Sequence, residues 1–221
     1  AHDAVGQARR RCWKRDWVVD LDIKAFFDSI DHELMMKALE KHTNERWVLL
    51  YVKRWLEAPV QLADGSLEER LVGTPQGGVI SPLLANLFLH YAFDEWMRRN
   101  FSSIPFERYA DDILVHCKSE RQARWIKTAI EKRLQQCQLQ LHPQKTKIVY
   151  CKDQTRRGNY PNEKFGFLGF THYWGRSRKG NWVIKKRTST KRIRRTKKSF
   201  WQWCRDHRHM PIVEQHKKLC A

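Results

Sequence analysis

The chain has 221 residues, of which 41% are hydrophobic and 12% aromatic, and this composition is sufficient for one well-buried core and a smaller appendage. Its formal net charge of +19 predicts a polyanionic partner, for which nucleic acid is the best fit. The absence of a signal peptide and of any long apolar run argues against secretion and against a membrane partner.

The positive charge is concentrated toward the C-terminus. Residues 151–221 hold 20 of the 43 lysines and arginines but only 4 of the 24 acids. A disordered tail would be poor in aromatic residues. This stretch instead contains Trp174, Trp182, Phe200, Trp201 and Trp203. We therefore expect a folded basic surface.

The chain is expected to begin inside a larger protein, because its first residue is not Met and residues 1–15 have the character of a helix already in progress. The six cysteines lack the paired close spacing of a disulfide framework. Together with the missing signal peptide, this predicts an intracellular, cytoplasmic location.

Residues 17–23 alternate as a strand does, with aliphatic side chains on one side and Asp20 and Asp22 on the other. Asp31 is expected to cap a helix that runs to about His42. A second helix is expected to start at Thr43 or Asn44 and to end before residue 59. Its apolar face, predicted to pack against the core, consists of Trp47, Leu50, Tyr51, Arg54 and Trp55.

Asp64-Gly65 predicts a tight hairpin between residues 60–62 and 67–72. After a loop over residues 73–78, Ser81 as N-cap and Pro82 at the first helical position predict a long buried helix.

Residues 106–109 and 113–116 are short strand-like runs, and a tight turn between them would hold Asp111 and Asp112 at the tip of a hairpin. Ser119 with Gln122 predicts a capping box for a helix over residues 120–137. Strand character returns after that helix, and a further hairpin is expected around Lys179-Gly180. Residues 185–198 are predicted to form a basic helix, and the order of elements predicts an α+β fold with an antiparallel sheet and helices on one face.

Asp22 and the Asp111-Asp112 pair lie far apart in sequence, but neighbouring strands would bring them close together. Such carboxylates repel one another unless cations lie between them. Two Mg²⁺ ions about 3.5–4 Å apart would favour in-line attack of a primer hydroxyl on a nucleotide α-phosphate. The alternative is a set of surface acids at turns, which an Asp-Asp pair alone does not exclude.

The neighbouring residues favour the catalytic interpretation. Residues 109–112, Tyr-Ala-Asp-Asp, resemble the Tyr-x-Asp-Asp box of reverse transcriptases, and residues 22–32 resemble their first catalytic motif. Residues 73–87, GTPQGGVISPLLANL, resemble the second motif in the form found in group II intron proteins and their bacterial relatives. Residues 139–146 resemble the next motif, and Phe167, Leu168 and Gly169 resemble the primer grip.

This resemblance implies a right-hand polymerase palm with a fingers remnant over residues 1–170. Residues 171–221 would form a hairpin and a basic, partly helical start of the thumb. Asp22, Asp111 and Asp112, with the Ile23 carbonyl, would hold two Mg²⁺ ions, or Mn²⁺ in their place.

The resemblance also implies roles for single residues. Phe27 would be the steric gate below the incoming sugar, with a core aromatic as the alternative. Gln76 would touch the incoming nucleotide or the template base, and Lys145 would protonate or screen the leaving pyrophosphate. Both also have plain alternatives, a turn residue and a solvated lysine. Five basic residues would contact the template–primer duplex: Arg192, Arg194, Arg195, Lys197 and Lys198.

The implied activity is that of an RNA-directed DNA polymerase that adds deoxynucleotides to a DNA primer on an intron RNA template, as in group II intron retrohoming. One alternative is an intron RNA-binding splicing cofactor, or maturase, without full polymerase activity. Another is a defence or CRISPR-associated reverse transcriptase. The oligomeric state is left open.

Overall fold

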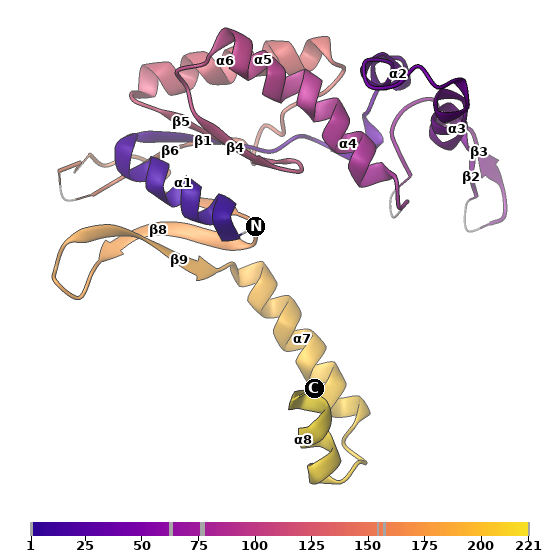
Figure 1. Ribbon diagram of the computed structural model, residues 1–221. Helices are drawn as coiled ribbons and strands as arrows, with labels where there is room; N and C mark the ends of the chain where they lie inside the picture. The colour runs from indigo at the N-terminus through magenta and orange to yellow at the C-terminus, as the bar shows by residue number, and fades with distance from the viewer. Residues whose placement is uncertain (1, 62–63, 76–77, 154, 157, 221) are drawn as a thin grey trace.

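Residues 2–61, 64–75, 78–153, 155–156 and 158–220 are described by the structure, which is a computed structural model. Figure 1 shows stacked layers: a helical layer, a four-stranded sheet, α1 and a second sheet, with α7 extending away from them. No helix in the described ranges has the length and apolar character needed to cross a membrane.

The four-stranded sheet is antiparallel, with strand order β4-β5-β1-β6. The strands are β4 Phe106–Tyr109, β5 Asp112–Cys117, β1 Trp17–Leu21 and β6 Lys147–Tyr150. β1 therefore lies inside the sheet, with β5 on one side and β6 on the other. The hairpin predicted around the two aspartates is confirmed.

The alternation predicted for β1 is confirmed as well. Val19 and Leu21 belong to the larger core cluster beneath the helices, whereas Val18 belongs to a smaller cluster on the opposite face. Asp20 shares that opposite face, because successive side chains of a strand point to opposite sides. The acids of β1 are thus turned away from the helical layer.

The helical layer consists of α4 Ser81–Leu89, a π-helical turn η2 His90–Asp94, α5 Glu95–Asn100 and α6 Glu120–Gln136. Ser119 caps α6 as predicted, since its hydroxyl accepts the Gln122 amide hydrogen at 3.2 Å. The predicted cap at Ser81 was wrong by one residue: Ile80 is the N-cap of α4. The Ser81 hydroxyl instead donates to the Pro75 carbonyl at 2.7 Å and closes the preceding loop.

The other face of the sheet is covered by α1 His2–Lys14 and by a three-stranded antiparallel sheet. Its strands are β7 Lys164–Phe167, β8 Phe170–Arg176 and β9 Trp182–Thr188. Val5 and Ala8 of α1 share a buried cluster with Phe165 and Ile184. The predicted α+β class is confirmed, as is the hairpin around Lys179-Gly180, and the second sheet adds a layer that the sequence did not predict.

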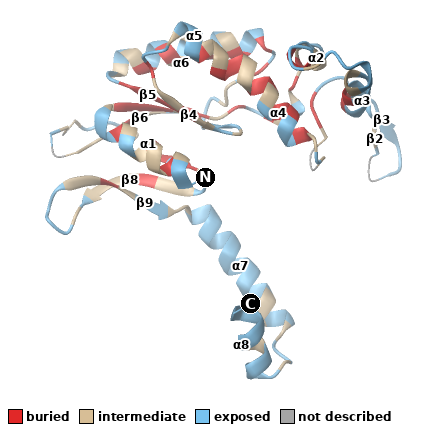
Figure 2. Ribbon diagram, in the orientation of Figure 1, coloured by how far each residue is buried: buried red, intermediate tan, exposed pale blue. Residues whose placement is uncertain are grey.

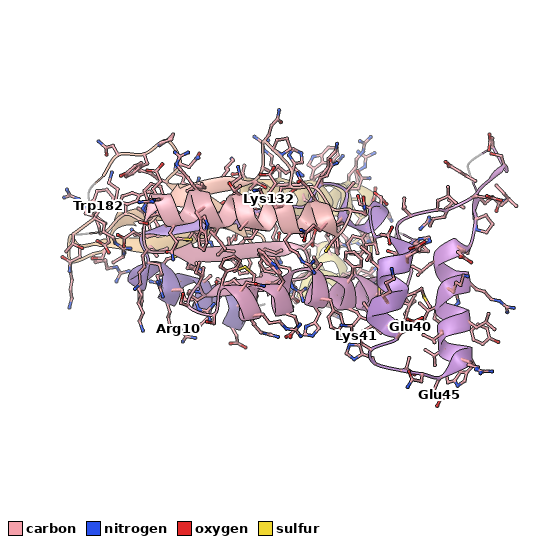
Figure 3. All side chains as sticks on the ribbon, turned by 90° about the horizontal axis from the view of Figure 1, so that it is seen from above. Arg10, Glu40, Lys41, Glu45, Lys132 and Trp182 are labelled. Carbon is pink, nitrogen blue, oxygen red and sulfur yellow. The ribbon has the colours of Figure 1, made fainter. Side chains whose placement is uncertain are left out.

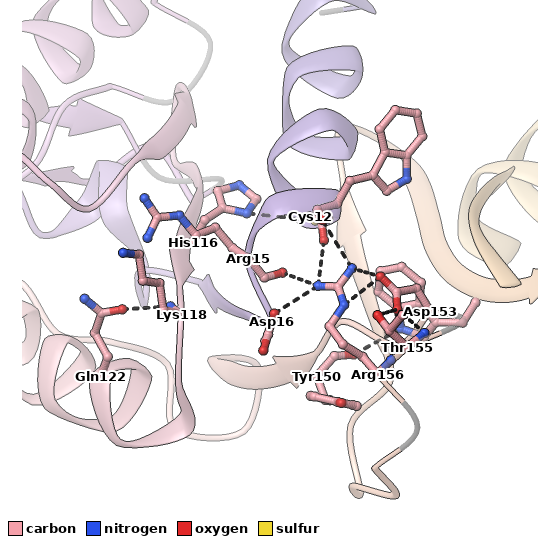
Figure 4. Close-up of polar contacts among 12 residues, drawn as sticks. Cys12, Arg15, Asp16, His116, Lys118, Gln122, Tyr150, Asp153, Thr155 and Arg156 are labelled. Carbon is pink, nitrogen blue, oxygen red and sulfur yellow. Dashed lines mark hydrogen bonds and ion pairs between the residues drawn. The ribbon is translucent and has the colours of Figure 1, made fainter.

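Arg156 fastens the C-terminal end of α1 to the segment that follows β6 (Figure 4). Its guanidinium donates to the carbonyls of Cys12 and Arg15 at 3.1 and 2.8 Å and pairs with the carboxylates of Asp16 and Asp153. The last carbonyls of a helix have no partner within the helix. Arg156, whose side chain is 12% exposed, supplies the donors that they need.

At one end of the molecule, α2 His32–Leu39 and α3 Arg46–Glu57 stand beside the hairpin of β2 Val60–Gln61 and β3 Leu67–Glu68. The predicted cap of α2 is confirmed, because the Asp31 carboxylate accepts the Leu34 amide hydrogen at 2.8 Å. The predicted start of α3 was wrong. Its N-cap is Glu45, and the Thr43 hydroxyl accepts the amide hydrogen of Glu45. Figure 3 shows Glu45 at the foot of α3.

The predicted packing face of α3 was also wrong. Val52 and Leu56 are its buried residues, whereas the expected stripe from Trp47 to Trp55 points outward. The helix is apolar on two sides, and periodicity does not tell which of them meets the core.

The C-terminal segment forms α7 Thr190–Asp206 and α8 Ile212–Cys220 (Figure 1). Part of the predicted basic helix is not helical, since residues 185–188 belong to β9. Ser189 ends that strand and caps α7, with its hydroxyl accepting the Arg192 amide hydrogen. Figure 2 shows α7 exposed over most of its length, with a half-buried stretch near its C-terminal end and no buried residue.

Candidate active site

The three aspartates meet at the edge where β1 ends and β5 begins. Leu21 pairs with Ile113, so continuing the register by one residue places Asp22 opposite Asp112. Ala110 has φ 54°, and this left-handed conformation closes the tight β4–β5 turn. Asp111 follows within the turn and is exposed. The structure thus brings together acids that are about ninety residues apart in sequence.

The electrostatics of this edge are those of crowded negative charge. Burial raises the pKa of Asp112, and the charges of Asp111 and Asp22 raise it further, while a hydrogen bond from the Leu168 backbone opposes the shift. The pKa of Asp20 is raised to about 7, first by burial and then by the charges of Asp112 and Asp22, against a hydrogen bond from the Gly166 backbone.

The chemistry of the aspartates, and not their present spacing, suits a divalent cation. Among the described residues, no group of three or more His, Cys, Asp or Glu side chains is placed so that it could hold a metal ion. Carboxylate oxygens are, however, the ligands that Mg²⁺ prefers. The repulsion that raises the pKa of Asp112 is also the interaction that a bound cation would relieve.

Ile23, whose carbonyl is a candidate metal ligand, directly follows Asp22 in the chain. Ile23 forms an isolated antiparallel bridge with Leu141. The hydrogen bonds of that bridge run from the Lys24 amide to Gln140 and from the His142 amide to Asp22, both at 2.8 Å. The Ile23 carbonyl therefore takes no part in this pairing.

Lys145 lies beside the first aspartate. Its ammonium group is 3.4 Å from an Asp22 carboxylate oxygen, and its side chain remains 62% exposed. The adjacent Thr146 is buried and exchanges hydrogen bonds with the Asp22 backbone at 3.3 Å. The segment between α6 and β6 thus contains Lys145 and also fixes the backbone of Asp22 through Thr146.

Arg108 is a supporting residue that the sequence did not reveal. Its guanidinium forms a two-pronged ion pair with Asp94 at 2.8 and 2.5 Å, and it also donates to the Asn86 side chain and to the Ala110 carbonyl. It therefore ties the aspartate turn to η2 and α4. The available signals were its position before Tyr109 and the presence of Asn86 in the stretch that resembles the second motif.

Phe27 lies in a short 3₁₀ turn, η1 Phe26–Asp28, and packs partly buried against the main core. The loop that starts at Gly73 is docked on this turn, because the Thr74 amide donates to the Phe27 carbonyl at 2.7 Å. Gly73 has φ +83°, and a side chain there would meet the backbone of Asp28 at 2.8 Å. Only glycine allows this close approach. Gln76 lies outside the described residues.

The turn between β7 and β8 contacts the edge of the four-stranded sheet where Asp112 lies. Leu168 and Gly169 both have positive φ, as a two-residue hairpin requires. Phe167 is buried, whereas the Leu168 backbone bonds to Asp112.

A groove of about 600 Å³ continues from this turn to α7. It is lined by Asp112, Leu168, Gly169, Ser189, Lys191, Arg192, Arg195 and Thr196. Of the five basic residues predicted to contact a duplex, Arg192 and Arg195 therefore open onto the groove beside the carboxylates. Arg194, Lys197 and Lys198 are exposed elsewhere on α7.

Comparison with known proteins identifies a family and several relatives of this chain. A family described as "Reverse transcriptase (RNA-dependent DNA polymerase)" matches residues 3–172. The group II intron-encoded protein LtrA of Lactococcus lactis subsp. cremoris is 34% identical over 89 residues, which are 40% of this chain and 15% of LtrA. Protein YkfC of Escherichia coli K12 is 26% identical over 203 residues, covering 74% of this chain and 49% of YkfC.

The fold is also found in a solved structure. Apo telomerase of Candida tropicalis, truncated from its C-terminal domain, superimposes with a TM-score of 0.62 at 13% identity. The match covers 85% of this chain and 39% of the telomerase chain. The chain thus spans about half the length of YkfC and less than half of LtrA and of the telomerase chain.

Proposed function

This chain belongs to the reverse transcriptase (RNA-dependent DNA polymerase) family, and from that membership we propose that it is the catalytic palm of an RNA-directed DNA polymerase. It would add deoxynucleotides to a DNA primer on an RNA template. The observation that carries this proposal is the meeting of Asp22, Asp111 and Asp112 at one edge of the sheet, beside a basic groove.

Each side chain at this edge has a task that suits its position. Asp22, Asp111 and Asp112, with the Ile23 carbonyl, would hold two Mg²⁺ ions, or Mn²⁺ in their place. When bound, the ions would supply the Lewis acidity that makes the primer hydroxyl nucleophilic and offsets charge at the α-phosphate.

The protein's own groups account for the remaining steps. The new bond would join the primer 3′ oxygen to the α-phosphorus, the bond from that phosphorus to the pyrophosphate oxygen would break on the opposite side, and the hydroxyl proton would pass to water. Lys145, now paired with Asp22, would turn to the departing pyrophosphate and give it a proton or a counter-charge. Phe27 would exclude a ribose 2′-hydroxyl by its volume, and the primer end would lie on the Phe167-Leu168-Gly169 turn.

The name of LtrA, a group II intron-encoded protein, favours an intron RNA as the template. Binding of intron RNA as a splicing cofactor is a second candidate function, favoured by the basic groove along α7. The two functions are compatible, because RNA binding needs the basic residues, whereas polymerisation also needs the aspartates. The role in retrohoming and the palm boundary near residue 170 both belong to this proposal.

Replacing Asp111 with Ala in the full-length protein should lower primer extension on an RNA template by on the order of 100-fold or more. Binding of Mn²⁺, followed by electron paramagnetic resonance, should weaken in parallel. Replacement of Glu131, an exposed acid of α6, by Ala is the matched control and should change neither readout. Activity of Asp111→Ala within a few-fold of wild type would contradict the proposal.

A further inference from the structure

The outward side of α3 is an apolar surface that is largely exposed in the described part of the chain. Trp47, Leu50, Tyr51 and Trp55 are 63%, 47%, 48% and 46% exposed, although each is large and hydrophobic. The helix is fixed to the molecule by its other side, through buried residues such as Leu56. An exposed patch of this kind usually marks a binding surface.

The aromatic residues on this surface form a ladder. Trp47, Tyr51 and Trp55 follow one another at intervals of four residues, so they lie roughly 6 Å apart along one side of the helix. The rings of Tyr51 and Trp55 have centroids 6.2 Å apart and planes inclined by 33°. Three flat rings in a row form a surface on which successive unpaired nucleic-acid bases can stack.

The charges around the ladder are suited to a polyanion. Arg54 lies among the three rings, at helical spacing from Tyr51 and Leu50, and it is exposed. Arg46 and Lys53 flank the ladder. The acids at the two ends of the helix are the N-cap Glu45 and Glu57, and Glu57 is paired with Lys53 at 3.8 Å. Neither Arg46 nor Arg54 has an ion-pair partner in the part of the chain that the structure describes.

We propose that the outward side of α3 binds single-stranded nucleic acid. Unpaired bases stack on Trp47, Tyr51 and Trp55, and Arg54 contacts the backbone phosphates. Arginine and aromatic residues also occur at protein interfaces, so the choice of a nucleic acid rests on the regular row of rings and on the basic side chains of Arg46, Lys53 and Arg54 around it. α3 carries none of the candidate catalytic residues, so this inference does not depend on polymerase activity.

The test compares two classes of nucleic acid without nucleotides present. Fluorescence anisotropy on the intact chain would measure affinity for oligo-U, for oligo-dT and for a blunt duplex. Trp47→Ala with Trp55→Ala should weaken binding of the single strands by about tenfold or more, because each stacked base contributes strongly to binding. Affinity for the duplex, whose bases are already stacked, should stay unchanged.

Three further variants test whether the effect depends on the rings and the charge of this surface. Trp13→Ala with Trp125→Ala removes two tryptophans that are 52% and 55% exposed on other helices, and it should leave all three affinities unchanged. Trp47→Phe with Trp55→Phe retains flat rings and should retain most of the single-strand affinity. Arg54→Gln should lower the slope of log affinity against log salt by roughly 0.7, the value for one phosphate contact on a single strand.

Three results would overturn the proposal. The alanine pair could leave single-strand affinity intact, or it could weaken duplex and single strands equally. It could also turn a dimer into a monomer in analytical ultracentrifugation, which would assign the surface to contact between copies of the chain. Unpaired RNA and unpaired DNA both count in favour, and their relative affinity tells which strand the surface prefers.

Discussion

Phe27 shows how one residue can serve both packing and selection. Its ring packs on the main core and lies 5.4 Å from that of Phe26, while its carbonyl holds the loop that starts at Gly73. The backbone of the turn is therefore fixed independently of the ring. Truncation of the side chain should leave the loop in place.

Phe27→Ala should raise incorporation of ribonucleotides relative to deoxynucleotides, because a smaller side chain leaves room for a 2′-hydroxyl. We expect a change of on the order of tenfold or more, comparable to other discriminations by pocket shape. Single-nucleotide extension with each substrate would measure the ratio. An unchanged ratio in a folded variant would mean that Phe27 acts only in packing.

His172 is a buried titratable residue on the second sheet. Its ring is stacked on Phe165 at 4.7 Å, and neither ring nitrogen has a hydrogen-bond partner among the described residues. Burial lowers the pKa of His172 to about 4, and the positive charges of Lys186 and Arg9 act in the same direction. The folded state therefore holds this imidazole neutral.

The consequence is a loss of stability in mild acid. Between the usual pKa of about 6.5 and about 4, the unfolded chain binds a proton that the folded chain does not, so the free energy of unfolding falls as the pH drops. His172→Phe should reduce this loss by about 2 kcal/mol between about pH 7.5 and about pH 5. Denaturant unfolding of both proteins at about pH 7.5 and about pH 5 measures it. Equal losses would show that His172 does not contribute.

At the scale of elements, Arg108 connects the aspartate turn to two helices. Arg108→Gln removes the ion pair with Asp94 but no metal ligand. Because the turn would lose its tie to η2 and α4, kcat should fall by roughly tenfold or more. Arg98→Gln, which breaks an exposed helical pair with Glu95, is the matched control and should leave kcat unchanged. A purely structural role would lower Tm without changing kcat.

Local signals in the sequence predicted local structure well. The caps at Asp31 and Ser119, the hairpin around Asp64-Gly65 and the alternation along β1 each depend on a few adjacent residues, and all are present. The second strand of that hairpin is shorter than predicted, because it ends at Glu68 and not at residue 72. The meeting of the aspartates could be expected from the resemblance to a known family. The register that places Asp22 opposite Asp112 could not be read from spacing alone.

The predictions from the sequence were wrong or incomplete where contacts between distant residues determine the structure. Periodicity finds an apolar side of α3 but cannot choose between two of them. Arg108 pairs with Asp94 because the fold brings η2 against β4. Nothing in the local sequence around either residue predicts this ion pair. Residues 185–188 carry charges that suit either a helix or a strand, and they are held in β9 by pairing with β8.

At the scale of the whole molecule, α7 determines which way many of the positive charges behind the net charge of +19 face. Arg192 and Arg195 line the groove beside Asp112, whereas Arg194 and Lys197 lie on the other side of the helix. If the groove receives a template–primer duplex, then charges on the two sides of α7 are not equivalent. Composition alone could not have made this distinction.

Arg192→Gln with Arg195→Gln should weaken binding of an RNA–DNA duplex and lower the slope of log affinity against log salt by roughly one unit per lost phosphate contact. Arg194→Gln with Lys197→Gln removes the same charge from the opposite side and should have a smaller effect. Affinity measured at several salt concentrations separates the two pairs. Equal slopes for both variants would argue for a diffuse field instead of contacts in the groove.

The position of β1 inside its sheet also sets the order in which the site is made. β1 precedes both of its partners in the chain, since β5 and β6 follow about 100 and 130 residues later. At translation rates of about 5–20 residues per second, Asp22 would wait on the order of 5–20 s for the strand that brings Asp112. During that time the apolar residues of β1 have no partner strand, so the nascent chain exposes a segment that is prone to non-native pairing.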